Sequence, residues 1–163
     1  MAHYNRGNAL RGLEQHEEAV ASYRASLEAV YDPRFPGPTA EQQASQRWKT
    51  LSNMGDALRQ MAGREAESIA SYEAAIAIAP REAYTAHFNQ GVVRYTQQEP
   101  IAAAEAFATA VAILPTYADA YNNLAAALEK LARYRESSAQ FHHALRLWPA
   151  RANPAHKSEQ KPY

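Results

Sequence analysis

Small, aromatic and proline residues recur at one spacing in the second half of the chain. The matched pairs, whose numbers differ by 34, are Gly91 and Ala125, Phe107 and Phe141, Ala110 and Ala144, and Pro115 and Pro149. A period of about this length is typical of pairs of helices that stack and bury one another's apolar faces. The pattern therefore predicts an array of helical hairpins between Tyr84 and Pro149.

Two earlier copies extend this array toward the N-terminus. The nearer copy holds Gly55, Tyr72, Ala75 and Pro80, and the first copy holds Gly7, Ala19, Tyr23 and Ser26. One extra residue falls in the turn at 62–64, and an insertion of about 15 residues separates the first two copies. A loop absorbs such additions cheaply, because the entropy of loop closure grows slowly with length. The chain therefore has room for about four hairpins.

The recurring residues are those that a tight helical hairpin needs. Glycine, or Ala125 in the last copy, lets the first helix of a hairpin approach the second closely. The second helix also has a small side chain at this contact, which we call the seam. These small residues of the second helices are Ala19, Ser68, Ala103 and Ser137. The same helices then carry the rings of Tyr23, Tyr72, Phe107 and Phe141, and one turn later Leu27, Ile76, Val111 and Leu145. This spacing predicts one apolar stripe per second helix.

Prolines mark the ends of three second helices, since proline lacks an amide hydrogen and clashes with the preceding turn. They are Pro80, Pro115 and Pro149, whereas Pro100 falls at a helix start, where proline is tolerated. The expected helices span about 2–14, 17–31, 40–61, 65–78, 82–97, 100–113, 118–131 and 135–147.

These positions resemble the tetratricopeptide repeat family, and the segment 121–125, Tyr-Asn-Asn-Leu-Ala, resembles a first helix of that family. The resemblance implies an all-α fold, a right-handed α-solenoid of about four hairpins. Three residues depart from the family pattern: Arg6 and Gln90 replace leucine, and Arg94 replaces a large apolar residue. The departures make the first and third repeats less regular or indicate contacts beyond the chain.

The resemblance divides the chain into six segments. They are repeat one at 1–33, a proline-rich insertion with a helix extension at 34–47, repeat two at 48–81, repeat three at 82–115, repeat four at 116–149, and a polar tail at 150–163.

The insertion at 34–47 allows two interpretations. Thr39 and Gln42 have the spacing of a capping box, which predicts a second-repeat helix that begins about two turns early. The simpler interpretation is a tolerated loop followed by an overlong helix. The other is a contact with a partner protein through Phe35 and Trp48, because aromatic residues often anchor interfaces.

Composition removes several classes of partner. Lysine plus arginine and aspartate plus glutamate both number 17, so no positive field favours nucleic acid. The chain has no cysteine, which excludes disulfides and cysteine zinc sites and fits a reducing compartment. No signal-like stretch opens the chain, and no run of about 18 apolar residues follows. We expect a soluble intracellular protein without membrane insertion, in the cytoplasm or in an organelle.

Enzymatic motifs are missing from the sequence. It has no phosphate-binding glycine loop, no Gly-x-Ser-x-Gly elbow and no His-Glu-x-x-His motif. His142 and His143 are adjacent, so on a helix they point about 100° apart and cannot share a metal. We therefore expect no enzyme, no cofactor and no metal, and we look for function on a surface.

Asparagine occupies one place in all four predicted first helices, two residues before the seam glycine or alanine. The four residues are Asn5, Asn53, Asn89 and Asn123. First helices line the concave wall of stacked hairpins, so the carboxamides would form a ladder that offers donors and acceptors. Such a ladder can pair with the backbone of an extended peptide. Asparagine at this place is also common in the tetratricopeptide family, so inheritance is an equally good explanation.

Helical spacing places further residues on the same face. The predicted peptide-binding set is Asn5, Asn8, Arg11, Lys49, Asn53, Asp56, Arg59, Phe88, Asn89, Tyr95, Asn122 and Asn123. This groove would be basic at its start, aromatic in the third repeat and mixed, with an acidic bias, at its end. A peptide with an acidic segment followed by an apolar anchor would suit it.

Some members of the family hold a C-terminal carboxylate, as found in chaperone tails, with lysines, asparagines and an arginine. Asn8 and Asn53 match two of these places, but Tyr4, Thr85 and Asn89 stand where the cations belong. We therefore do not expect binding of chaperone tails. The asparagine positions look more like the repeat region of protein O-linked N-acetylglucosamine transferases, although the catalytic domain of those enzymes is absent.

Three functions remain open on the sequence. The first is a non-catalytic protein-interaction scaffold that binds an extended peptide in its concave groove. The second is a structural subunit or assembly factor in a larger multiprotein complex, held by its convex face, the Phe35 loop and its last helix. The third is a substrate-holding part of a glycosyltransferase whose catalytic region lies elsewhere.

Overall fold

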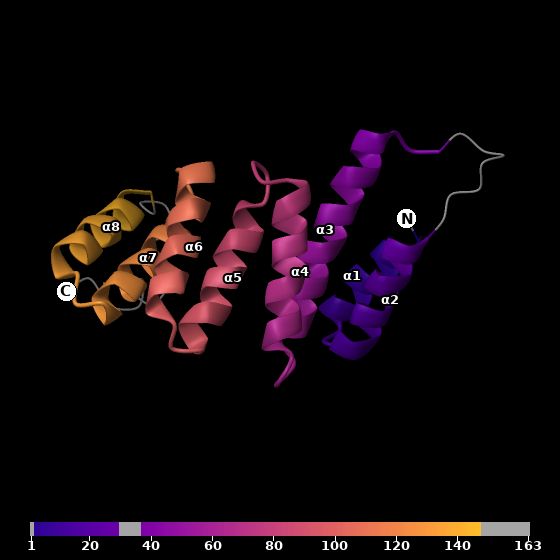
Figure 1. Ribbon diagram of the computed structural model, residues 1–163, viewed down its shortest axis with the longest axis horizontal. Helices are drawn as coiled ribbons and strands as arrows, with labels where there is room; N and C mark the ends of the chain where they lie inside the picture. The colour runs from indigo at the N-terminus through magenta and orange to yellow at the C-terminus, as the bar shows by residue number, and fades with distance from the viewer. Residues whose placement is uncertain (1, 30–36, 148–163) are drawn as a thin grey trace, which may run out of the picture.

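The computed structural model describes residues 2–29 and 37–147, which form eight α-helices (Figure 1). The helices are α1 (Ala2–Gly12), α2 (His16–Glu28), α3 (Ala40–Arg59), α4 (Glu65–Ile78), α5 (Tyr84–Thr96), α6 (Pro100–Ile113), α7 (Ala118–Lys130) and α8 (Tyr134–Leu147). Each matches a helix expected from the sequence within a few residues. The predictions about Phe35, Pro149 and the tail at 150–163 lie outside the described residues.

Glycine allows the two helices of a hairpin to pack closely, as the repeat pattern predicts. A Cβ atom built on Gly7, Gly55 or Gly91 would lie 2.5–2.7 Å from the ring of Tyr23, Tyr72 or Phe107, respectively. Those rings are buried, so they have no free space into which to move. The same register in three hairpins confirms the predicted seam.

Serine strengthens this seam in two hairpins. Ser68 Oγ donates to the carbonyl of Gly55 at 2.8 Å, and Ser137 Oγ donates to that of Ala125 at 2.9 Å. A small side chain thus permits the close approach of the helices and also adds a hydrogen bond between them.

The hairpins stack in chain order into an elongated array (Figure 1). Each second helix packs on the first helix of the next hairpin, so α2 contacts α3, α4 contacts α5 and α6 contacts α7. The first helices α1, α3, α5 and α7 also contact their neighbours directly, whereas within 2–29 and 37–147 no two second helices do. A stack whose layers touch on one side and separate on the other curves toward the touching side. The first helices therefore line the inner face.

Apolar side chains at the hairpin junctions form the core. Tyr23 packs with Leu58 of α3, and Tyr72 packs with Val93 of α5. Phe107 packs with Leu128 of α7. Each ring is therefore covered by the following hairpin.

The prediction that Phe141 inserts its ring in the same way is wrong. Phe141 is 47% exposed, and Leu145, one turn later, is 49% exposed. The reason is that no described helix follows α8 to cover this stripe. The last hairpin therefore presents outward the apolar face that the other three bury.

The long helix α3 begins with the predicted capping box. Gln42 N donates to Thr39 Oγ1 at 3.2 Å, and Thr39 N donates to Gln42 Oε1 at 2.9 Å. Trp48 of this helix is half-buried and packs against the cluster that contains Leu51 and Tyr72. At least part of the Trp48 side chain therefore serves internal packing, as the simpler interpretation of the helix extension requires.

Candidate functional site

The predicted peptide-binding residues all lie on the first helices. The set comprises Asn5, Asn8 and Arg11 on α1; Lys49, Asn53, Asp56 and Arg59 on α3; Phe88, Asn89 and Tyr95 on α5; and Asn122 and Asn123 on α7. Because these helices adjoin, side chains from successive repeats come within hydrogen-bond distance of one another.

At the junction of the first two hairpins, Asn8 is a shared acceptor. Its Oδ1 accepts from Asn53 Nδ2 at 2.8 Å and from the Tyr23 hydroxyl at 2.8 Å. Asn53 Nδ2 also donates to the Tyr4 hydroxyl at 3.3 Å. Burial raises the pKa of Tyr23 to about 12, so its hydroxyl stays protonated and donates. This network joins α1, α2 and α3.

At the second junction, Asp56 takes the same role. Its Oδ1 accepts from Asn89 Nδ2 at 2.7 Å and from the Tyr72 hydroxyl at 2.9 Å, and its Oδ2 accepts from Arg11 Nη1 at 2.8 Å. Burial raises the pKa of the Asp56 carboxyl, while the hydrogen bond from Tyr72 and the charge of Arg11 oppose that shift. One carboxylate therefore connects three successive hairpins.

The third junction lacks this arrangement. Asn123 Nδ2 donates to the carbonyl of Asp119 in its own helix, at 2.8 Å. The place of the shared acceptor is held by Val92, and the ring is Phe107, which has no hydroxyl. Asn5, in the first hairpin, is exposed. The four asparagines therefore share a sequence position but not a common bonding pattern.

These contacts change what the predicted ladder can offer to a peptide. The amino groups of Asn53 and Asn89 are used to join neighbouring hairpins. In the described part of the chain, no hydrogen bond uses the Oδ1 atom of either residue. The Oδ1 atoms of both side chains are therefore without a partner there, whereas each amino group makes at least one hydrogen bond inside the protein.

The third and fourth hairpins contribute aromatic rings. Phe88 lies with its ring centroid 5.6 Å from that of Phe107 and 5.0 Å from that of Tyr117, and Tyr84 meets Tyr117 edge-on at 5.5 Å. Tyr95 is half-buried against the same cluster. The predicted aromatic segment of the face is thus a packed group with partly exposed edges.

A polar hollow of about 600 Å³ lies at the edge of the inner face, between α1, the start of α2 and α3. Its lining residues are Asn8, Arg11, Gly12, Glu14, His16, Asp56, Arg59 and Gln60. Helical spacing predicted Arg11, Asp56 and Arg59 as groove residues but not His16, which begins the second helix of the hairpin. The distance between these residues along the sequence hid their proximity.

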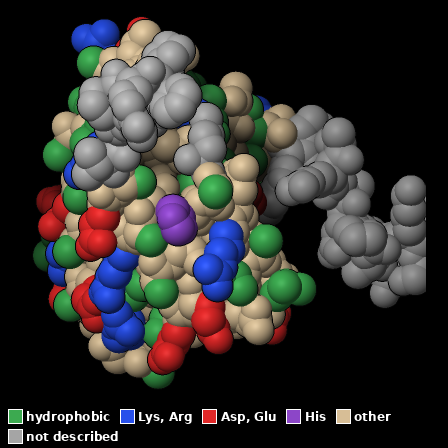
Figure 2. Space-filling view, turned by 90° about the vertical axis from the view of Figure 1, so that its right-hand side faces the viewer, with side chains coloured by type: hydrophobic (Ala, Val, Ile, Leu, Met, Phe, Trp, Pro, Cys, Tyr) green, Lys and Arg blue, Asp and Glu red, His purple; other side chains and the backbone are tan. Residues whose placement is uncertain are grey.

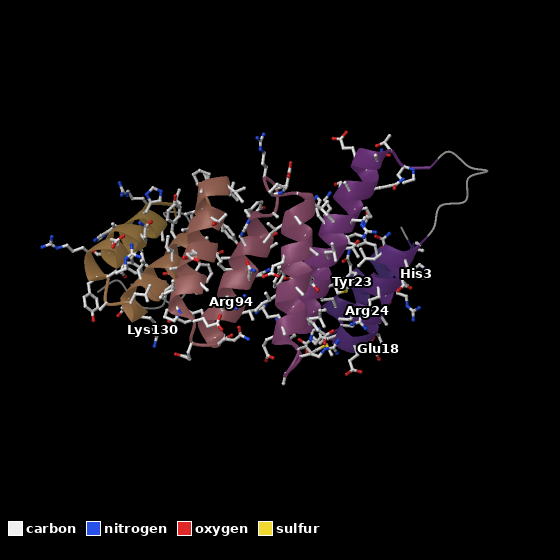
Figure 3. All side chains as sticks on the ribbon, viewed as in Figure 1. His3, Glu18, Tyr23, Arg24, Arg94 and Lys130 are labelled. Atoms are coloured by element: carbon white, nitrogen blue, oxygen red, sulfur yellow. The ribbon has the colours of Figure 1, made fainter. Side chains whose placement is uncertain are left out.

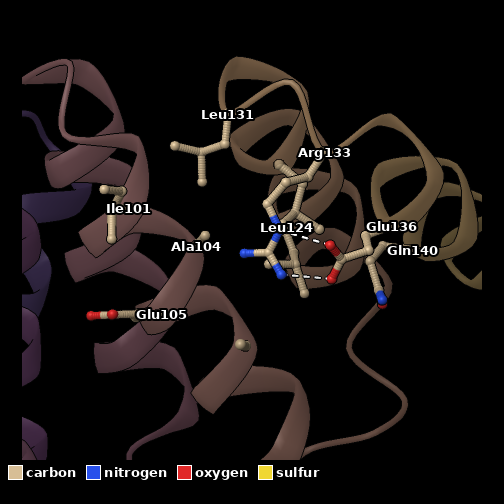
Figure 4. A pocket seen from close by; sticks show the side chains of 10 residues that line it. Ile101, Ala104, Glu105, Leu124, Leu131, Arg133, Glu136 and Gln140 are labelled. Carbon is tan, nitrogen blue, oxygen red and sulfur yellow. Dashed lines mark hydrogen bonds and ion pairs between the residues drawn. The ribbon is translucent and has the colours of Figure 1, made fainter.

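A second hollow, of about 590 Å³, lies on the side of the second helices (Figure 4). Its apolar lining includes Ile101 of α6, Leu124 of α7 and Leu131, which directly follows α7. On α8's side, Arg133 donates to both oxygens of Glu136, at 2.7 and 2.6 Å. This convex hollow thus has apolar walls next to an ion pair.

Charges of both signs are mixed on the described surface. Figure 2 views the end that carries α1 and α2, where acidic and basic side chains lie next to one another. Within 2–29 and 37–147, no three histidine or acidic residues are placed to hold a metal ion. No helix of the described part combines the length and apolar character that crossing a membrane requires.

Comparisons with protein families identify the repeats at both ends of the chain. Models of the tetratricopeptide repeat match residues 2–29 and 118–156. Neither model describes a catalytic family. No curated protein matches the sequence.

Solved structures share the fold at low sequence identity. MamA superimposes with a TM-score of 0.73 and 19% identity over 89% of this chain and 75% of its own. YrrB is described as a tetratricopeptide protein with an unusual peptide-binding site. It superimposes with a TM-score of 0.70 and 16% identity over 96% of this chain and 73% of its own. The second repeat domain of Spaghetti (RPAP3), bound to the HSP90 peptide SRMEEVD, superimposes with a TM-score of 0.62 and 19% identity. The match covers 67% of this chain and 99% of that domain. At these identities the likeness concerns the fold alone.

Proposed function

We propose that this chain, an all-α solenoid of tetratricopeptide hairpins, is a non-catalytic scaffold that binds an extended protein segment along its inner face. The observation that carries the proposal is the direct contact of α1, α3, α5 and α7, which makes one continuous surface from four repeats. An extended peptide has polar groups at regular intervals, and a surface built from repeats can match them.

The chemistry of the inner face supports a backbone-binding role. The Oδ1 atoms of Asn53 and Asn89 are fixed in place by the bonds of their own amino groups, so they lose little entropy on accepting a peptide N–H. Asn123 offers a further carboxamide, and the edges of Phe88 and Tyr95 offer apolar contact. The resemblance to the asparagine positions of protein O-linked N-acetylglucosamine transferase repeats agrees with this mode of binding.

Two of the structural neighbours also support a peptide ligand, since one is described with a peptide-binding site and another is bound to an HSP90 peptide. This chain lacks the cations that such chaperone tails require in the family pattern, with Tyr4, Thr85 and Asn89 in those places. The ligand we propose is therefore an internal extended segment rather than a chaperone C-terminus.

The test is selection of ligands from a library of short random peptides with blocked termini, followed by fluorescence anisotropy. The variant combines Asn122→Ala with Asn123→Ala, because within the described residues the Asn123 side chain is hydrogen-bonded only to its own helix. Each lost hydrogen bond should cost about 0.5–1.5 kcal/mol, so with two bonds lost we expect binding to weaken about 5- to 150-fold. The variant should keep its helical circular dichroism spectrum.

The matched control is Thr109→Ala on α6, whose hydroxyl donates to the Glu105 carbonyl in the same i, i−4 geometry. This residue lies on a second helix, away from the inner face, so we expect unchanged peptide affinity. Selected peptides that bind the double variant as tightly as the parent chain would contradict binding along all four repeats of the inner face.

A second candidate function is that of a subunit or assembly factor in a larger complex. The exposed apolar stripe of α8, with Phe141 and Leu145, and the convex hollow near Ile101 favour it. Two results together would support this function over peptide binding. The chain would select no peptide from the library, and size-exclusion chromatography of the native source would show it in a large complex that Phe141→Ser dissociates.

A further inference from the structure

Arg59 lines the polar hollow, and no acidic side chain within residues 2–29 and 37–147 lies at hydrogen-bond distance from it. Two other arginines of the inner helices are paired, since Arg11 Nη1 lies 2.8 Å from Asp56 Oδ2 and Arg94 Nη1 lies 2.8 Å from Glu99 Oε2. The Arg59 Nε atom is buried and makes no hydrogen bond within the described residues. A buried donor on a charged group is costly to leave unpaired, so an external anion would relieve that cost.

A second unpartnered atom lies in the wall of the same hollow. His16 Nδ1 is buried and likewise has no hydrogen-bond partner among the residues described. In the tautomer that carries its proton on Nδ1, this ring donates a hydrogen bond. Two elements, the end of α3 and the start of α2, thus bring unpartnered nitrogen atoms to the wall of one hollow.

Two acceptors in the wall of the hollow are already occupied. Asn8 Oδ1 accepts from Tyr23 and Asn53, and the Asp56 carboxylate accepts from Tyr72, Asn89 and Arg11. Asn8 and Asp56 therefore need no donor from a ligand, whereas a ligand that supplies an acceptor complements the unpartnered nitrogen of Arg59.

The charges of the hollow favour a monoanion over a dianion. The Arg11 charge is balanced by Asp56, and Arg59 adds one positive charge, while Glu14 adds a negative charge at the rim. A phosphate group, with a charge of about −1.5 to −2, would exceed this and be repelled by Asp56 and Glu14. A carboxylate fits the charge, and a hollow of about 600 Å³ easily holds its side chain.

We propose that the polar hollow binds the carboxylate of an aspartate or glutamate side chain in the partner segment, with Arg59 as its cation and His16 as a further donor. This inference rests on the proposed peptide-binding function and specifies its ligand. It places the acidic residue of the ligand beside the first two hairpins, at the end of the inner face away from the aromatic group near Phe88.

The test compares the full chain with Arg59→Gln, using peptides selected from the blocked random library. We expect the selected peptides to share an acidic position, and its Asp→Asn or Glu→Gln change to weaken binding to the parent chain at least tenfold. Against Arg59→Gln, the acidic and amide peptides should bind equally. Arg59→Lys should keep part of the preference, because it retains the charge without the planar fork.

Arg135→Gln is the matched control, since Arg135 is an exposed arginine on α8, far from the hollow. It should leave the preference for the acidic peptide unchanged, and melting curves should show that all variants are folded. Selected peptides without a shared acid, or an acid whose effect survives Arg59→Gln, would overturn the inference while leaving groove binding intact. A stronger preference for phosphoserine than for aspartate would also overturn it. Failure to select any peptide would instead count against the proposed function itself.

Discussion

One hydroxyl group distinguishes the rings of the first two hairpins from the ring of the third. Tyr23 and Tyr72 donate to Asn8 and Asp56, which follow the seam glycines of their hairpins. Where the ring is Phe107, the residue at that place is Val92, which has no acceptor. Ring and acceptor thus change together, because a buried hydroxyl without a partner costs free energy and a buried acceptor without a donor does too.

The first prediction concerns Asp56. Asp56→Ala removes the acceptor of the buried Tyr72 hydroxyl and of Asn89, so the free energy of unfolding should fall by about 2 kcal/mol or more. Asp56→Asn keeps a carbonyl oxygen for both donors and loses mainly the pair with Arg11, whose side chain is 35% exposed. Since partly exposed pairs contribute little, this change should cost less than about 1 kcal/mol. Urea unfolding followed by circular dichroism measures both.

A control for this prediction reproduces the third hairpin in the second. Tyr72→Phe combined with Asp56→Val removes donor and acceptor together, so it should cost less than Asp56→Val alone. Equal losses for Asp56→Ala and Asp56→Asn would show that the shared acceptor does not stabilise the junction.

At this scale, the sequence predicted positions better than contacts. The helical spacing placed Asn53 and Asn89 on the first helices, as the structure has them. It did not reveal that Asn8 and Asp56 lie against the next hairpin, because this depends on how far one hairpin is shifted along its neighbour. The sequence held one signal of these contacts. Where the ring changes from Tyr to Phe in the third hairpin, the residue after the seam glycine changes from Asn or Asp to Val.

The turns within the hairpins show a shared conformation at the level of elements. Glu14, Gln98 and Ala132 have positive φ angles of 60°, 62° and 57°, and Gly63 has 78°. After each of the three non-glycine residues, the next amide donates back to the helix, as Arg133 N does to the Leu128 carbonyl at 3.0 Å. This is a helix ending that glycine adopts without steric cost and that other residues adopt with strain.

The second prediction follows from that strain. Ala132→Gly should raise the free energy of unfolding by up to about 1 kcal/mol, because glycine avoids the Cβ clash of the left-handed conformation. Ala70→Gly, at an exposed position within α4, is the matched control and should lower it by roughly 0.5–1 kcal/mol. Thermal and urea unfolding of both variants give the comparison. Destabilisation by both substitutions to the same extent would mean that the turn stores no such strain.

Helix boundaries were well predicted, because the repeat register sets where each helix lies and Pro80, Pro100 and Pro115 mark helix ends or starts. The end of the array was not. The ring pattern predicted insertion of Phe141, but a ring is buried only when a following element covers it, and the repeat pattern within one hairpin carries no information about its neighbour.

The whole molecule is a linear array, so its stability depends on each junction between hairpins. At the first and third junctions, Leu58 and Leu128 occupy equivalent places and are buried. At the second junction that place is held by Arg94, seen on α5 in Figure 3, whose Nη2 atom lies 4.0 Å from Glu73 Oε1. One turn earlier, Gln90 Nε2 donates to the same carboxylate at 3.2 Å. The departures from the repeat pattern thus make the middle junction more polar than the other two.

The last prediction tests whether this polar junction limits the cooperativity of the array. Combining Gln90→Leu with Arg94→Leu should raise the free energy of unfolding by about 1–3 kcal/mol, since each leucine buries apolar area and exposed Glu73 can return to water. In an array with nearest-neighbour coupling, a stronger middle junction also makes both halves unfold together. Hydrogen exchange should therefore distinguish α1–α4 from α5–α8 in the parent chain and show one common protection level in the variant. Arg135→Leu, on the exposed face of α8, should produce neither effect. The unfolding midpoint and the hydrogen exchange of the double variant could instead both stay unchanged. That result would mean that Arg94 and Gln90, through Glu73, already join the two halves as firmly as leucines would. The polarity of this junction would then serve a purpose other than flexibility.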